Sequence, residues 1–128
     1  MSDYNSQNNR AVWFDIPVFD LNRAAEFYSS VLSIKVSKEQ FGDISFCLLE
    51  HAEGNGGCLV ERPKEVASAS GILLYMNVAG RIRDAVSKVS EKGGSVLEDT
   101  HSIGPHGFRA LVLDSEGNRI ALHSETDA

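Results

Sequence analysis

The chain has 128 residues, of which 42% are hydrophobic and 23% charged, and its formal net charge is -6. This length and apolar content predict one compact domain with a core of its own and exclude a disordered chain. Acidic and basic residues are scattered along the chain, so neither nucleic acid nor an anionic membrane is expected as a partner.

No apolar run approaches the roughly 18 residues that a membrane span needs. The first residues lack the pattern of a signal peptide, and we therefore expect a cytoplasmic protein. Cys47 and Cys58 have neither metal-ligand nor redox spacing, which predicts two free, buried thiols. Residues 1–10 are polar and without apolar periodicity, so they are interpreted as a frayed arm before a single domain at 11–126.

The first half of the domain predicts a strand, a helix and three strands. Apolar and polar residues alternate through the first strand, and Asp20 is expected to cap a helix whose apolar residues recur at helical spacing. A Gly42-Asp43 turn joins the next two strands. In order, the predicted elements are residues 12–18, 21–33, 34–41, 44–51 and 58–61.

After a polar connection at residues 62–70, the same order of elements begins again. The second set is predicted at residues 71–78, 81–92, 95–98, 108–113 and 119–123, with the helix ending at Gly93-Gly94. The chain therefore predicts an α+β protein of two βαβββ modules, at about 12–62 and 71–124, which is an internal repeat of structure rather than of identical residues.

Several short segments, in this order, resemble one superfamily. They are Trp13-Phe14-Asp15-Ile16-Pro17-Val18, Asp20-Leu21, Gly93-Gly94, Gly107-Phe108 and the segment from Asp114 through Gly117-Asn118-Arg119-Ile120 to His123. Together they are similar to the vicinal oxygen chelate superfamily, which includes glyoxalase I, bleomycin-resistance proteins, fosfomycin-resistance transferases and extradiol dioxygenases. The resemblance implies a homodimer in which paired modules form half-open, eight-stranded barrels around a cavity, and many members hold a divalent metal there.

The resemblance also implies where metal ligands would stand, because metal-dependent members take them from the first, fourth, fifth and eighth strands. In this sequence those positions fall on Trp13, Cys58 or Val60, Leu73 and Ala121. Three of the four cannot bind a metal, and a lone Cys58 thiolate would have no fellow ligands. We therefore expect that the metal site is lost and that no cofactor is bound; a divalent metal is expected only if this alignment is wrong.

Strand parity predicts what lines the cavity instead. Trp13 and Asp15, Tyr75 and Asn77, and Ala121 and His123 alternate with the apolar residues that face the helices. Because Asp15 and His123 share this parity, we hypothesise that the carboxylate orients the imidazole as a catalytic pair. The alternative is a satisfied hydrogen-bonded pair that closes the end of the barrel.

Ligand-binding roles are assigned to Trp13, Tyr75, Asn77, Phe108 and Arg109. Core filling by Trp13, internal hydrogen bonds of Tyr75 and Asn77, and a surface ion pair of Arg109 remain open alternatives. His101 and His106 lie in a loop rich in glycine and proline and are expected to be exposed to solvent. Residues 114–118 are interpreted as a turn without a further role.

Three functions follow from these residues. The favoured one is a metal-free protein that binds a small compound, aromatic or cationic, in the manner of bleomycin-resistance proteins. The second is an enzyme similar to lactoylglutathione lyase or to a dioxygenase, acting on a small organic substrate. The third is a dimeric interaction module with a vestigial cavity.

Overall fold

The computed structural model describes residues 10–66 and 71–128 and contains the βαβββ order twice. Module one consists of β1 (Trp13–Val18), α1 (Leu21–Leu32), β2 (Val36–Phe41), β3 (Ile44–Leu49) and β4 (Gly56–Glu61). Module two consists of β5 (Leu74–Asn77), α2 (Ile82–Glu91), β6 (Ser95–Ser102), β7 (Phe108–Leu113) and β8 (Arg119–Ser124). Two short 3-10 helices, η1 (Pro63–Glu65) and η2 (Gly104–His106), lie in the connections. The predicted α+β class and the two modules are confirmed.

The N-terminal arm, the two thiols and the lengths of the helices are also predicted from the sequence. The predicted frayed arm at residues 1–10 lies outside the described residues, except for Arg10. Cys47 and Cys58 are both free and buried, as expected. Within residues 10–66 and 71–128, neither helix has the length and apolar character needed to cross a membrane.

Local sequence explains where α1 begins and ends. The Asp20 side chain accepts a hydrogen bond from the backbone N–H of Arg23 at 3.0 Å, which satisfies one of the unpaired amides of the first turn. Ser33 ends the helix in the left-handed conformation, with φ 56°. The apolar stripe of α1 is buried and consists of Leu21, Ala24, Phe27, Tyr28 and Val31.

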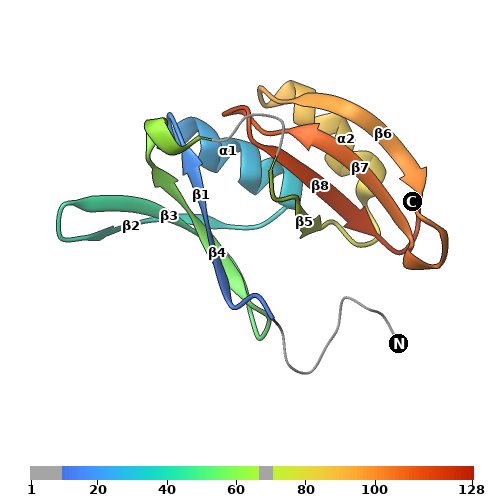
Figure 1. Ribbon diagram of the computed structural model, residues 1–128, viewed down its shortest axis with the longest axis horizontal. Coiled ribbons are helices and arrows are strands. Elements are labelled where there is room, and N and C mark those ends of the chain that lie inside the picture. Colours follow the sequence, from blue (N-terminus) through green and yellow to red (C-terminus); the bar gives the residue numbers. More distant parts are fainter. Residues whose placement is uncertain (1–9, 67–70) are drawn as a thin grey trace.

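Each module forms one four-stranded sheet, in the order β1-β4-β3-β2 in module one and β5-β8-β7-β6 in module two. The parallel pairs are β1 with β4 and β5 with β8. The two sheets lie side by side, and α1 contacts α2 across the boundary between the modules (Figure 1). One apolar core therefore runs through both modules, between the helices and the helix-facing side of each sheet.

The strands differ most from prediction at β6, which continues to Ser102 instead of ending at residue 98. β6 pairs only with β7, and two register shifts interrupt this pairing. An edge strand with such irregularities is half exposed to water and needs no regular alternation of apolar residues. Its polar run from Glu98 to Ser102 therefore gave no strand signal in the sequence.

The turn between β7 and β8 does more than reverse the chain, which corrects the interpretation of residues 114–118. The Glu116 carboxylate is buried and accepts hydrogen bonds from the backbone N–H groups of Phe19 and Asp20, each at 2.9 Å. Arg23 binds the same carboxylate with two nitrogens, at 2.7 and 2.8 Å. The turn of module two thus holds the start of α1 in module one.

A second carboxylate in this turn strengthens the same junction. Asp114 accepts a hydrogen bond from the buried Tyr28 hydroxyl at 2.6 Å, and it also accepts the backbone N–H groups of Glu116 and Asn118. The Asn118 amide donates to the carbonyl of Pro17, at the end of β1, at 2.8 Å. These buried polar groups are paired with one another, so they fix how the two modules meet.

Candidate functional site

Each sheet has a helix-covered face and an opposite face, which we call its open face. Ile16, Met76 and Leu122 belong to the core on the helix side, as the alternation predicts. On the open face of module two, Tyr75 pairs with Ala121, and His123 stands between Asn77 and Arg109. The predicted site residues of this module, with the exception of Phe108, therefore share one surface.

Four side chains on this surface are joined by hydrogen bonds and ring contacts; we call them the Arg109 cluster (Tyr75, His101, Arg109 and His123). The Arg109 guanidinium donates from one terminal nitrogen to the Tyr75 hydroxyl at 2.6 Å and from Nε to His101 Nε2 at 3.1 Å. The rings of Tyr75 and His123 lie 6.4 Å apart between centroids. Side chains from β5, β6, β7 and β8 thus meet at one place.

The hydrogen bonds place one ring proton on each histidine of the cluster. His101 Nε2 accepts from Arg109, and Nδ1 lies 2.9 Å from the carbonyl of Asp99, so Nδ1 carries the proton and the ring is neutral. The Glu98 carboxylate, 3.7 Å from His101 Nε2, is therefore not ion-paired to it. His123 Nε2 lies 2.7 Å from the carbonyl of His106, and because a carbonyl only accepts, Nε2 is the donor.

His101 and Phe108 are not where the sequence predicted them. His101 belongs to β6 and is half-buried within the Arg109 cluster, rather than in an exposed loop. Phe108 packs against the core on the helix side of β7, because its parity is opposite to that of Arg109. A strand-parity signal for Phe108 was available in the sequence, whereas the irregular β6 hid the position of His101.

The open face of module one carries Trp13, Asp15 and Cys58. Asp15 Oδ1 accepts a hydrogen bond from the Cys58 thiol at 3.2 Å. Burial and the neighbouring Asp15 carboxylate raise the pKa of the Cys58 thiol to about 11, so the thiol stays protonated at neutral pH. The Trp13 ring, on a residue that is 44% exposed, meets the His51 ring edge-on at 5.9 Å.

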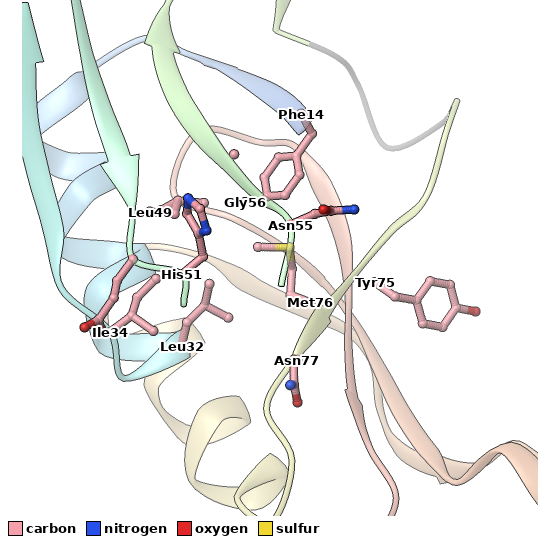
Figure 2. A pocket seen from close by; sticks show the side chains of 12 residues that line it. Phe14, Leu32, Ile34, Leu49, His51, Asn55, Gly56, Tyr75, Met76 and Asn77 are labelled. Carbon is pink, nitrogen blue, oxygen red and sulfur yellow. The ribbon is translucent and has the colours of Figure 1, made fainter. Parts of the chain in front are cut away.

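A cavity of about 340 Å³ lies between the modules. Figure 2 shows it from close by, with apolar side chains including Phe14, Leu49 and Met76 and with the polar side chains His51 and Asn77. Tyr75 also lines the cavity; Figure 2 shows its ring turned away from the other lining side chains, and its hydroxyl accepts a hydrogen bond from Arg109. β5 therefore borders both the cavity, through Tyr75, Met76 and Asn77, and the Arg109 cluster, through Tyr75.

This fold and this arrangement of strands can be set beside known proteins. A family model described as the Glyoxalase/Bleomycin resistance protein/Dioxygenase superfamily matches residues 10–122. The chain belongs to this superfamily. A glyoxylase-like domain-containing protein of Didymella fabae is 30% identical to it over 115 residues, which are 84% of this chain and 88% of that protein.

Solved structures of the superfamily share its fold. A glyoxalase/bleomycin resistance protein from Albidiferax ferrireducens T118 matches with a TM-score of 0.69 and 15% identity, over 91% of this chain and 98% of that one. TnmS3, an antibiotic binding protein from Streptomyces sp. CB03234, matches with a TM-score of 0.66 and 18% identity, over 94% of this chain and 98% of that one. These identities are low, so the structural matches show the fold alone.

The positions onto which the sequence resemblance places the metal ligands do not carry a fitting set of donors. Trp13, Leu73 and Ala121 offer no side-chain oxygen, sulfur or imidazole, and the Cys58 thiol is bonded to Asp15. Within residues 10–66 and 71–128, no three His, Cys, Asp or Glu side chains converge as a metal site would require. No step of a reaction is therefore derived through a metal.

The structure does not bring Asp15 and His123 together within one chain, which corrects the predicted proximity. Asp15 bonds to Cys58 in its own sheet, and His123 bonds to the carbonyl of His106 in the other. In the described residues the modules contact each other mainly through α1 and α2, whereas Asp15 and His123 stand on different sheets. The catalytic role of the pair stays a prediction.

Proposed function

We propose that this protein, a member of the glyoxalase/bleomycin resistance/dioxygenase superfamily, binds a small organic molecule on the open face of module two and does so without a divalent metal. The observation that carries the proposal is the Arg109 cluster, in which polar side chains from four strands converge on one surface. Next to it lies the half-buried Leu111, which supplies apolar surface. Small-molecule sites typically combine a small number of converging polar groups with an apolar surface.

The proposal includes a homodimer that completes this site. Apolar side chains are exposed on the module-one sheet, with Trp13 at 44%, Ile44 at 48% and Phe41 at 78%. Figure 1 shows that the β2–β3 hairpin, which carries two of them, extends away from the rest of the molecule. A second copy that places its module two against this face would bury the apolar side chains and enclose the ligand. In that dimer the predicted Asp15 and His123 pair would form between copies.

Binding in the cytoplasm agrees with the two free thiols, which a reducing compartment preserves. The fold shared with TnmS3, an antibiotic binding protein, agrees with a binding role. Metal-free binding agrees with the poor donor set at Trp13, Leu73 and Ala121. These points support the proposal from three independent directions.

The first experiment is a thermal-shift screen of the purified full chain against a small-molecule library, with elemental analysis of the same preparation. A ligand present at 100 times its Kd should stabilise the folded state by about 2.7 kcal/mol and raise Tm accordingly. Light scattering should give the mass of two chains. A stoichiometric, tightly held divalent metal would refute the metal-free part, and a screen without any Tm shift would refute the binding function.

Two histidine variants decide which surface takes the ligand. His123→Ala removes part of the Arg109 cluster, whereas His51→Ala alters the cavity between the modules. We expect the Kd of any hit from the screen to rise at least tenfold with His123→Ala and to stay within twofold with His51→Ala. The reverse result would place the ligand in the cavity of Figure 2.

A further inference from the structure

Unlike most other arginines in the described chain, Arg109 forms no ion pair with a carboxylate. Four arginines there lie within 4.0 Å of a carboxylate: Arg23, Arg62, Arg81 and Arg83. Arg109 instead donates to two neutral acceptors, the Tyr75 hydroxyl and the His101 ring. These bonds hold the guanidinium in place without cancelling its positive charge.

The geometry leaves part of the guanidinium available to a ligand. The bonds to Tyr75 and His101 use one terminal nitrogen and Nε, while no described residue bonds to the second terminal nitrogen of Arg109. The guanidinium therefore keeps three of its five N–H donors, two of them on the second terminal nitrogen. A carboxylate accepts such donors in charge-assisted hydrogen bonds, which are roughly twice as strong as neutral ones.

The surroundings of Arg109 favour an anion with a compact apolar body. Its neighbours across the sheet are His123 on β8 and His101 on β6, and neither side chain is acidic. The exposed Glu98 carboxylate lies 3.7 Å from His101 Nε2 and is not within 4.0 Å of the Arg109 guanidinium. Two positions farther along β7, Leu111 stands beside Ala121 on β8, and Tyr75 on β5 is the strand partner of the same alanine on its other side. A carboxylate on Arg109 would thus place the rest of its molecule over Leu111 and the Tyr75 ring.

We infer that the site selects small organic carboxylates over neutral and cationic compounds and that Arg109 determines this specificity. The inference rests on the proposed binding function and narrows its ligand class. It also replaces the cationic alternative of the sequence-based expectation, which was an aromatic or cationic compound, by an anionic one. Coulomb interactions of exposed charges are screened within about 10 Å at ordinary salt, so acids farther than this from Arg109 matter little, and the nearby Glu98 carboxylate is exposed to solvent and to the same screening.

The test uses matched pairs of probes that differ in charge but hardly in shape: benzoate and benzamide, phenylacetate and phenylacetamide, and benzylamine as a cation. Kd values are measured by NMR titration of the full chain at constant ionic strength. For the wild type we expect the carboxylates to bind at least tenfold more tightly than the amides and the cation. Inorganic phosphate is included as an anion without an apolar body and should bind more weakly than benzoate.

Three variants separate the role of Arg109 from general effects of charge. Arg109→Gln should weaken carboxylate binding about 10- to 100-fold and leave amide binding within twofold. Arg109→Lys keeps the charge but not the planar fork, so it should recover only part of the loss. Arg83→Gln is the matched control: it removes the same charge from the exposed surface of α2, where the guanidinium bonds to Asp127, and should change nothing.

The outcomes distinguish this inference from the proposed function. Equal binding of amides and carboxylates, or a preference that survives Arg109→Gln, would overturn the inference and leave the binding function intact. Phosphate that binds more tightly than benzoate would overturn the carboxylate class. If no probe and no library compound binds the wild type, the binding function fails and the inference fails with it. Circular dichroism of each variant verifies that it is folded.

Discussion

Replacing Glu116 by Gln tests whether the β7–β8 turn holds the two modules together. Burial by itself raises the pKa of Glu116, but the bonds from Arg23 and from the backbone of Asp20 and Phe19 outweigh burial and lower the pKa from 4.5 to about 2. A difference of 2.5 units between 4.5 and 2 corresponds to about 3 kcal/mol of folding free energy carried by the ionised carboxylate. Gln keeps the size of the side chain and removes this charge.

We therefore expect Glu116→Gln to lower the free energy of unfolding at pH 7 by about 2 to 3 kcal/mol. The lower value allows for Arg23, whose side chain is half exposed and regains water when the carboxylate is lost. Urea unfolding measures this as a lower midpoint with an unchanged slope m. Glu26→Gln, which removes an exposed acid from α1, is the control and should stay within about 0.5 kcal/mol.

The pH dependence gives the sign of the effect. A carboxyl whose pKa is lowered on folding stabilises the protein fully above pH 4.5, and this contribution disappears as the pH falls through 2. The difference between wild type and Glu116→Gln should consequently be constant from pH 7 to 5 and fall to about half by pH 3. A difference below about 0.5 kcal/mol at pH 7, or one that does not shrink between pH 5 and 3, would refute the reasoning.

Three other residues carry predictions of their own. Gly94→Ala should lower the free energy of unfolding in urea by about 1 to 3 kcal/mol, because an added Cβ would lie 2.4 Å from the carbonyl oxygen of Leu113. Gly54→Ala is the control and should be nearly neutral, since a Cβ there would meet nothing within 4 Å. Tyr28→Phe should cost about 1 to 3 kcal/mol by the same measurement, since the buried Asp114 carboxylate loses the 2.6 Å hydrogen bond from the Tyr28 hydroxyl and keeps those from Glu116 and Asn118; an unchanged midpoint would contradict this. Cys58 should react with iodoacetamide far more slowly at pH 8 in the folded protein than in urea, because its thiol pKa is raised to about 11; equal rates would exclude that environment.

The sequence predicts most of the secondary structure and which residues of a strand lie on the same face of the sheet, because both follow from local periodicity. The N-cap at Asp20 and the end of α1 at Ser33 are local signals, and the structure confirms both. Alternation correctly separated Tyr75 and His123 from Met76 in the core, since neighbouring residues of a strand point to opposite faces. The irregular edge strand β6 was the exception, and with it His101 was misplaced.

Length and composition, apolar periodicity and the helix caps determined the α+β class and the repeated βαβββ order, because each depends on residues that lie close together in the chain. Only the tertiary structure decided how the two modules meet. Glu116 is 93 residues from Arg23, and Arg109 is 34 residues from Tyr75, so nothing in the local pattern links the partners. A polar turn that faces water and one that forms a buried junction have the same kinds of residues; which of the two forms depends on the packing of α1 against α2.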